Sequence, residues 1–353
     1  MAKIFRARMT RYRILRIAIA AACALWCVPA PAPAARARQR FYVPDTISVP
    51  ARRILHEFDG VRFGDDFPAS QSLSAWKRVQ ALYARPAAIR IRQAIAEYGV
   101  TVTRRVLGGV PVLDVRPRGW VRDRRVIVYA HGGAYVVLSA AADIPEAAAL
   151  SAVSDERVIS IDYTLAPEAH WKAIQGQALS VFAALRASGY RMDDIAMAGD
   201  SAGGGLTVST VLNLRDRRLG MPAAAVLLSP WVDLTDRGDT MTTLAGADPM
   251  LSYWGLKIAA RAYAGSLPLD DPRVSPLYAN FRKGFCPTLI QEGTKTIFLS
   301  GSVRLYRALA AAGAHPVLDM YEGMWHDFQF VSWLPESRAA YKTMAAFIRS
   351  HQK

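Results

Sequence analysis

The residues with the clearest chemical meaning lie around Ser201, in the sequence G-D-S-A-G-G at positions 199–204. A short apolar run at 194–198 precedes the serine, and the apolar side chains of residues 202–215 follow helical spacing. A strand, a sharp turn and a helix in this order expose a serine hydroxyl at a helix N-terminus, where the dipole favours developing negative charge. A glycine-rich turn without chemistry is the alternative, but the fit of all three elements favours a nucleophilic serine.

A second motif, H-G-G-A at 131–134, comes directly after a strand-like run at 125–130. Gly132 and Gly133 leave their backbone N–H groups unobstructed. Together with the amide of Ala202, they could donate hydrogen bonds to the oxygen of a tetrahedral intermediate. We expect His131, which opens this loop, to orient the loop through hydrogen bonds rather than to act as the base.

A nucleophilic serine needs a general base, and His326 is the strongest candidate among the six histidines. In hydrolases with the G-x-S-x-G turn, the base follows the serine in the chain. His326 lies in a loop after a predicted last strand at 316–321, whereas His315 precedes that strand and His351 lies in a C-terminal helix.

These motifs resemble those of the bacterial hormone-sensitive lipase-like esterases, also called the GDXG or family IV esterases. The resemblance spans roughly residues 100–350. Its six motifs are H-G-G-A at 131–134, D-Y-T-L-A-P-E at 162–168, G-D-S-A-G-G at 199–204, S-P-W-V-D-L-T at 229–235, D-P-R-V-S-P-L at 271–277 and E-G-M-W-H at 322–326.

The resemblance implies an α/β-hydrolase fold with an N-terminal helical cap. It also implies hydrolysis of short- to medium-chain carboxylic esters, or of lactones, without a cofactor. Ser201 would be the nucleophile and His326 the base; the oxyanion donors would be Gly132, Gly133 and Ala202. Asp200, His131 and Glu168 would be supporting residues, with Glu168 bracing the oxyanion loop unless it is a surface glutamate at a turn.

The chain departs from the family at the third member of the triad. The family places an acid after the strand that precedes the histidine, in a pattern like G-x-x-E/D, but Thr296 occupies that position here. Residues 293–314 contain no carboxylate. Glu292 at the strand end could supply the acid, Asp233 could supply it from another loop, or the enzyme could run on a dyad and be weakened. Asp327 and Asp319, near the histidine in sequence, are expected to be solvated.

The fold class also follows from the hydrophobic pattern. Short apolar runs alternate with helical stretches, which predicts an α/β fold with a mostly parallel sheet flanked by helices. The predicted strands are 126–130, 158–162, 195–198, 224–228, 288–291 and 317–321. No phosphate-binding loop or metal-ligand spacing occurs in the sequence.

Three segments are expected along the chain: a signal peptide at 1–34, a helical cap at 35–100 and a catalytic domain at 101–353. Predicted cap helices lie near 51–58, 72–83 and 87–98. Aromatic residues near the motifs could line the substrate pocket or pack in the core: Tyr135, Tyr253, Trp254, Trp325 and Phe328.

The first 34 residues have the composition of a secretory signal. Six basic residues precede a short apolar run at 17–28, and small residues follow it. We expect an exported, periplasmic or secreted protein; an uncleaved membrane anchor is the alternative. Cleavage would leave Cys286 as the one cysteine, without an internal disulfide, and this residue is expected to be a small buried hydrophobe.

The formal net charge of +15 does not indicate nucleic-acid binding. The basic residues outside the N-terminus are scattered, and no basic stripe is interleaved with aromatic residues. A solvated surface that tolerates peripheral contact with anionic lipids is the better interpretation. A family member that has lost catalysis and binds a ligand or partner remains the alternative to an esterase, and the sequence does not indicate the oligomeric state.

Overall fold

The computed structural model describes residues 42–58, 60–121, 124–235 and 237–353, so the predicted signal peptide lies outside the described residues. Within these ranges, eight strands form one sheet in the order β1-β2-β4-β3-β5-β6-β7-β8. Strands β3 to β8 run parallel, while β2 pairs antiparallel with both β1 and β4. The strands are β1 Thr101–Leu107, β2 Val110–Arg116, β3 Val126–Ala130, β4 Arg157–Ile161, β5 Ile195–Asp200, β6 Ala224–Leu228, β7 Thr288–Gly293 and β8 Val317–Tyr321. This mostly parallel α/β sheet is the one that the sequence predicted.

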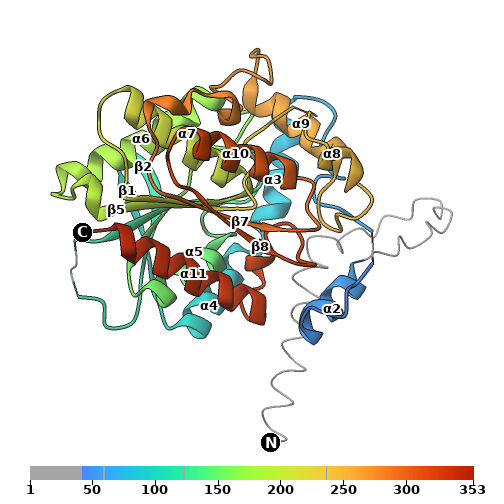
Figure 1. Cartoon of the computed structure of the whole chain (residues 1–353), viewed down its shortest axis with the longest axis horizontal. Coiled ribbons are helices and arrows are strands. Elements are labelled where there is room, and N and C mark those ends of the chain that lie inside the picture. The colour runs from blue at the N-terminus through green and yellow to red at the C-terminus, as the bar shows by residue number, and fades with distance from the viewer. Residues whose placement is uncertain (1–41, 59, 122–123, 236) are drawn as a thin grey trace, which may run out of the picture.

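Helices cover both faces of the sheet (Figure 1). Helices α4, α5 and α11 lie on one face, and α6, α7 and α10 lie on the other. The four central strands β3, β5, β6 and β7 are buried along their whole length. Burial on both faces explains the largely apolar sequences of β3, β5 and β6, whereas β7 also carries the buried polar residues Gln291 and Glu292. The helices are α2 Val49–Glu57, α3 Leu73–Ala84, α4 Ala87–Tyr98, α5 Ile144–Ser154, α6 Trp171–Ala187, α7 Ser201–Asp216, α8 Thr240–Thr243, α9 Tyr253–Ala264, α10 Leu299–Ala311 and α11 Pro335–His351.

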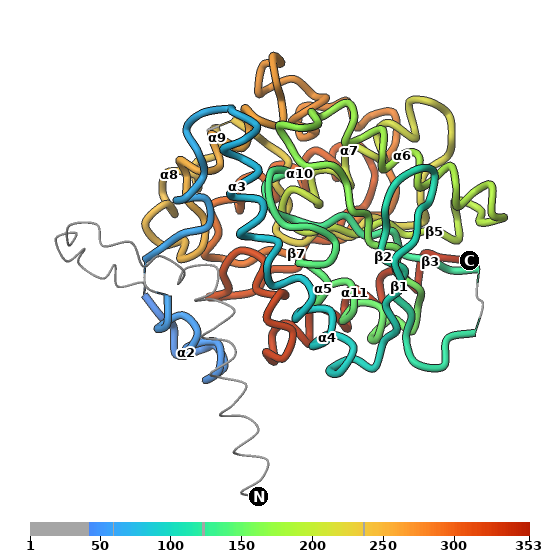
Figure 2. Tube along the Cα trace, turned by 180° about the vertical axis from the view of Figure 1, so that it is seen from behind, coloured from blue at the N-terminus to red at the C-terminus, as the bar shows by residue number. Residues whose placement is uncertain are grey.

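The three helices expected in the cap exist as α2, α3 and α4, but they do not form one unit. Helix α4 packs on α5 and so covers the sheet. Helix α3 lies beside α8 and α9, which come from the segment between β6 and β7 (Figures 1 and 2). The backbone of Phe63 pairs with that segment, where its N–H donates to the carbonyl of Met250 at 2.7 Å. The division of the chain at residue 100 stays a prediction.

The antiparallel hairpin β1–β2 was not predicted. The buried carboxylate of Asp114 in β2 contacts three arginines. The Oδ atoms lie 2.8 Å from Arg105 Nε, 2.8 Å from Arg116 Nη2 and 2.9 Å from Arg157 Nε. Burial alone would raise the pKa of Asp114, but the hydrogen bonds from Arg157 and Arg116 lower it below its usual value.

Two smaller expectations concern the membrane and the cysteines. Among the helices that the structure describes, none combines the length and the apolar character needed to cross a bilayer. Cys286 is free and buried in an apolar cluster, as predicted, and burial raises the pKa of its thiol to about 12.

Candidate active site

Ser201 begins α7 immediately after β5, at the turn that the sequence predicted. Its φ of +50° lies in the left-handed region, which is strained for a residue other than glycine. Gly203 makes the turn possible, because a Cβ there would collide with the carbonyl oxygen of Ala130 at the end of β3. The serine carbonyl accepts a hydrogen bond from the N–H of Trp231 at 2.8 Å. The neighbouring strands therefore fix the conformation of this turn.

His326 lies in the loop after β8, and its Nε2 is 3.0 Å from Ser201 Oγ. The loop is tied to the end of β7, because the N–H of Lys295 donates to the carbonyl of Met324 at 3.0 Å. The ring of Phe298 meets the imidazole edge-on at a centroid distance of 5.0 Å. Both reacting side chains are almost enclosed: the exposed fraction is 5% for Ser201 and 3% for His326. The structure thus brings together the predicted nucleophile and the predicted base.

The H-G-G-A loop lies against the start of α7. A Cβ on Gly132 would collide with Asp200 Oδ2, so only glycine fits there. The N–H of Gly132 has a long contact of 3.4 Å to Asp143 Oδ2. Ala202 is in the first turn of α7, where backbone N–H groups have no acceptor within the helix. Gly132 therefore lies against Asp200 and Ser201 at the start of α7, while its N–H is directed towards Asp143.

His131 orients this loop. Its Nδ1 lies 2.7 Å from the carbonyl oxygen of Gly132, and its ring stacks on Tyr163 at 4.1 Å between centroids. The Tyr163 hydroxyl donates to the His131 carbonyl at 2.9 Å. Burial lowers the pKa of His131, which keeps the ring neutral. These contacts fit the predicted orienting role.

Glu168 is placed differently from the family-based expectation. It forms an ion pair with Lys77 of α3, and 46% of its side chain is exposed. The loop is braced instead by Gln80 of α3, whose Nε2 donates to the carbonyls of Val136 at 3.0 Å and Ala166 at 3.1 Å. The sequence carried no motif that would have identified Gln80.

Asp200 belongs to a buried carboxylate cluster beneath the loop. The Tyr129 hydroxyl lies 2.8 Å from Asp200 Oδ1 and 2.9 Å from Glu146 Oε2. One hydroxyl has one hydrogen, so one of these contacts requires a protonated carboxyl group. Burial and the nearby Asp143 raise the pKa of Asp200 well above its usual value, and burial does the same for Glu146. Asp200 therefore supports the loop as part of a network rather than as an isolated charge.

No described residue forms a hydrogen bond with Nδ1 of His326, the atom that a triad acid would contact. Thr296 is buried, and its Oγ1 accepts from the N–H of Phe298 at 3.2 Å. Glu292 is buried nearby, but its oxygens accept from Ser302 Oγ at 2.6 Å and from the Gly293 N–H at 3.1 Å. Burial raises the pKa of Glu292 to about 7. Glu292 is therefore near the base without making the contact that the acid's role requires.

Asp233 points elsewhere. Its Oδ2 lies 2.6 Å from Arg304 Nη1 and accepts from the Tyr278 hydroxyl at 3.1 Å. Another carboxylate close to the base is Asp248, which is fully buried and accepts from the N–H of Ile297 at 2.9 Å. Asp248 interacts with His326 electrostatically, and sequence reasoning missed it because it lies in the segment before α9.

Asp327 was expected to be solvated, and this expectation was wrong. Its side chain is 13% exposed, and its Oδ2 lies 2.9 Å from Nε2 of His326. Burial alone would lower the pKa of His326, but Asp327, with Asp248 and Glu292 farther away, raises it above the usual value. The base of this site is therefore surrounded by carboxylates, although none occupies the usual position.

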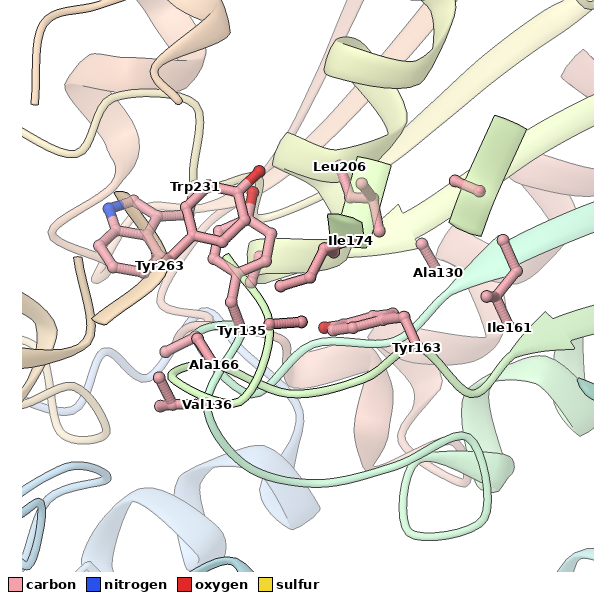
Figure 3. Close-up of a cluster of buried hydrophobic side chains, with 14 of the residues drawn as sticks. Ala130, Tyr135, Val136, Ile161, Tyr163, Ala166, Ile174, Leu206, Trp231 and Tyr263 are labelled. Atoms are coloured by element: carbon pink, nitrogen blue, oxygen red, sulfur yellow. The ribbon is translucent and has the colours of Figure 1, made fainter. Parts of the chain in front are cut away.

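The aromatic candidates separate into three groups. Trp325 and Phe328 are buried in the core, and Trp254 is largely exposed. Tyr253 is partly buried against the apolar cluster that contains Tyr135. Tyr135 stacks on Tyr263 at 3.7 Å between ring centroids and faces Trp231, beside the first turns of α7 (Figure 3). Of the five, Tyr135 thus lies nearest the oxyanion loop.

Comparisons with known proteins agree with this geometry. Residues 127–330 match the family described as having the alpha/beta hydrolase fold. An acetyl-hydrolase of Streptomyces hygroscopicus is 32% identical over 69% of this chain and 84% of its own length. An esterase of Acinetobacter venetianus is 32% identical over 64% of this chain and 75% of its own.

The solved structures that resemble this chain are also esterases. The esterase E25 has a TM-score of 0.82 at 27% identity and covers 93% of this chain and 99% of its own. An esterase described as belonging to the bacterial hormone-sensitive lipase family has a TM-score of 0.77 at 30% identity, and covers 87% of this chain and 99% of its own.

Proposed function

The chain belongs to the hormone-sensitive-lipase-like esterases of the alpha/beta hydrolase fold, and from this premise we propose that it hydrolyses short- to medium-chain carboxylic esters through an acyl-enzyme on Ser201. The observation that carries the proposal is the 3.0 Å distance between Ser201 Oγ and His326 Nε2 at a strained strand–helix turn. A lactone, which is a cyclic ester, would react by the same steps.

In the first step, Ser201 Oγ attacks the ester carbonyl carbon while its proton passes to Nε2 of His326. The carbonyl oxygen becomes negative and is held by the N–H groups of Gly132, Gly133 and Ala202. Each such donor typically contributes about 3 kcal/mol to the transition state. The imidazolium then protonates the departing alkoxide, which leaves an ester of Ser201.

In the second step, His326 takes a proton from water, and the resulting hydroxide attacks the acyl carbon. Collapse of this intermediate releases the carboxylic acid and returns the proton to Ser201. No step uses a metal or a cofactor. The enclosure of Ser201 and His326 strengthens the electrostatic interactions on which both steps depend.

Hydrolysis of para-nitrophenyl acetate and butyrate tests this proposal. Ser201→Ala should reduce the rate by a factor on the order of 10² or more, because the nucleophile is removed. Ser209→Ala is a matched control: Ser209 is buried in the same helix, and its hydroxyl has no hydrogen-bond partner among the described residues. A wild-type rate equal to that of Ser201→Ala would refute the esterase proposal.

That negative result would favour the second candidate function, a family member that binds an ester-like ligand or a partner without turnover. Two observations favour it: Thr296 stands at the acid position, and Nδ1 of His326 has no hydrogen-bond partner in the described part of the chain. Thermal-shift measurements with short-chain esters and their product acids would then report binding directly.

We also propose that residues 1–34 direct export of the protein. The support is the basic, apolar and small-residue pattern of the sequence. Cell fractionation and N-terminal sequencing of the mature chain test this. A full-length chain in the cytoplasm would contradict export, and a full-length chain in the membrane fraction would indicate an uncleaved anchor.

A further inference from the structure

Two groups compete for a single nitrogen of His326. Ser201 Oγ lies 3.0 Å from Nε2, and Asp327 Oδ2 lies 2.9 Å from the same atom. A ring nitrogen carries either one hydrogen or one lone pair in the plane of the imidazole, so it serves one of these partners well at a time. Nδ1, which a triad acid normally occupies, has no hydrogen-bond partner among the described residues.

The position of the carboxylate decides which tautomer is favoured. In a complete triad, an acid at Nδ1 keeps the hydrogen there and leaves the lone pair of Nε2 free to accept the serine proton. Here Thr296 leaves Nδ1 without a carboxylate, and Asp327 attracts the hydrogen to Nε2. A neutral histidine with its hydrogen on Nε2 cannot accept the proton of Ser201.

The surroundings of Asp327 keep it in this place. Its φ of +49° turns the chain so that the carboxylate folds back onto the preceding histidine. Its N–H donates to Ser229 Oγ at 3.2 Å. Asp327 also interacts electrostatically with the carboxyl groups of Asp143, Glu146 and Asp200, so any of these groups that is ionised repels its carboxylate. His326 itself also faces Asp248 and Glu292.

We propose that Asp327 is a positioning residue that holds His326 in a resting state, by competing with Ser201 for Nε2. The inference rests on the esterase function proposed above. In the acylation step, the bond between Ser201 Oγ and the acyl carbon forms while the Oγ proton moves to the lone pair of Nε2. That lone pair exists only when Asp327 has released Nε2, so each turnover requires the carboxylate to move away or the hydrogen to move to Nδ1.

The variants Asp327→Gly and Asp327→Asn test the proposal on the full-length protein with para-nitrophenyl butyrate. Glycine suits the left-handed backbone and removes the side chain, while asparagine tolerates the same φ and removes only the charge. The kcat of Asp327→Gly should rise about 10- to 100-fold, the range expected for the loss of one charge-assisted hydrogen bond, with a smaller rise for asparagine. KM should stay nearly unchanged.

The pH dependence of kcat/KM distinguishes this role of Asp327 from a purely structural one, because a structural role would not change the pKa of the base. Because Asp327 raises the pKa of His326, its removal should shift the acid limb of kcat/KM to lower pH. Asp319→Asn is the matched control. Asp319 is a carboxylate near the same loop, but it accepts from Gln291 Nε2 and the Tyr321 hydroxyl, both at 2.9 Å. Asp319→Asn should not shift the acid limb of kcat/KM.

A double-mutant cycle with Thr296→Glu makes the test specific. A glutamate at 296 should raise kcat more in the Asp327→Gly background than in the wild type, because the competing carboxylate is then gone. A fall in kcat for Asp327→Gly would overturn the proposal and make Asp327 the required acid. An unchanged kcat and acid limb would overturn it as well. Neither result would refute the esterase function itself, because only a wild-type rate equal to that of Ser201→Ala would do so.

Discussion

Ser201 Oγ lies 3.0 Å from His326 Nε2, although 125 residues separate the two positions in the chain. The serine follows β5 and the histidine follows β8, which is three places away from β5 in the sheet order. Both loops leave the carboxyl end of a parallel sheet, the edge where open α/β sheets place their ligands. The sheet topology is therefore what brings nucleophile and base together.

The first prediction concerns the acid position. Thr296→Glu supplies a carboxylate where the family has one, so kcat for para-nitrophenyl butyrate should rise about 10-fold or more. The rise should not exceed a factor on the order of 10⁴, which is the loss of kcat when a complete triad loses its acid. Thr296→Ser, which keeps a small hydroxyl, is the control. An unchanged kcat for the glutamate variant would show that the missing acid does not limit turnover.

The second prediction concerns Glu292 and stability. Burial raises its pKa to about 7 in the folded state, above the value of about 4.3 expected when the chain is unfolded. The folded state then binds more protons between these values, so stability falls as pH rises from about 4.5 to 7. The contribution is on the order of 3 kcal/mol.

The measurement is the free energy of unfolding in urea at several pH values. Glu292→Gln should remove that part of the pH dependence while hydrolysis stays within about threefold of wild type, because Glu292 does not hydrogen-bond the base. A loss of activity of 10²-fold or more in the glutamine variant, with stability intact, would identify Glu292 as the acid after all.

The third prediction concerns the oxyanion loop. A methyl group at Gly132 would collide with the carboxylate of Asp200, so Gly132→Ala should displace the loop and lower kcat by about 10²- to 10³-fold, the cost of losing one oxyanion donor. Gly176→Ala is the matched control, because nothing lies within 4 Å of a Cβ at that helical position. The control should keep full activity and gain about 0.5–1 kcal/mol of stability.

The fourth prediction separates stability from catalysis. Asp114→Ala leaves three arginines around a buried site, so it should lower the free energy of unfolding by about 3–5 kcal/mol. Residual folded protein should hydrolyse esters with a kcat near that of wild type, since β2 is remote from the loop that carries His326. Urea unfolding measures the stability, and active-site titration gives the concentration of active enzyme from which kcat is calculated. An unfolding midpoint equal to that of wild type would contradict the role given to Asp114.

The features that could be predicted from the sequence are those marked by a local motif or by their order along the chain. Ser201 and the H-G-G-A loop were recognisable because a strained turn and a crowded glycine position tolerate few residue types, and His326 followed from its place after the last strand. The central strands were predictable because burial on both faces makes them apolar. The hairpin β1–β2 was missed because most of β1 is exposed, so the strand lacks the apolar pattern that marks the central strands.

The contacts around the base could not be predicted from the sequence. Asp327 has a φ of +49°, a conformation that few residues other than glycine adopt and that nothing in the local sequence marks, and its carboxylate lies 2.9 Å from Nε2 rather than in water. Similarly, Gln80 braces the oxyanion loop only because α3 packs across it, and nothing in the local sequence of that helix marks the contact.

The most direct test of the account is mass spectrometry of the protein after treatment with a fluorophosphonate, which phosphonylates activated serines. We predict one adduct, on the peptide that contains Ser201, with no adduct in Ser201→Ala and much slower labelling in His326→Ala. Absence of an adduct in the wild type, or an adduct on a different serine, would contradict the account.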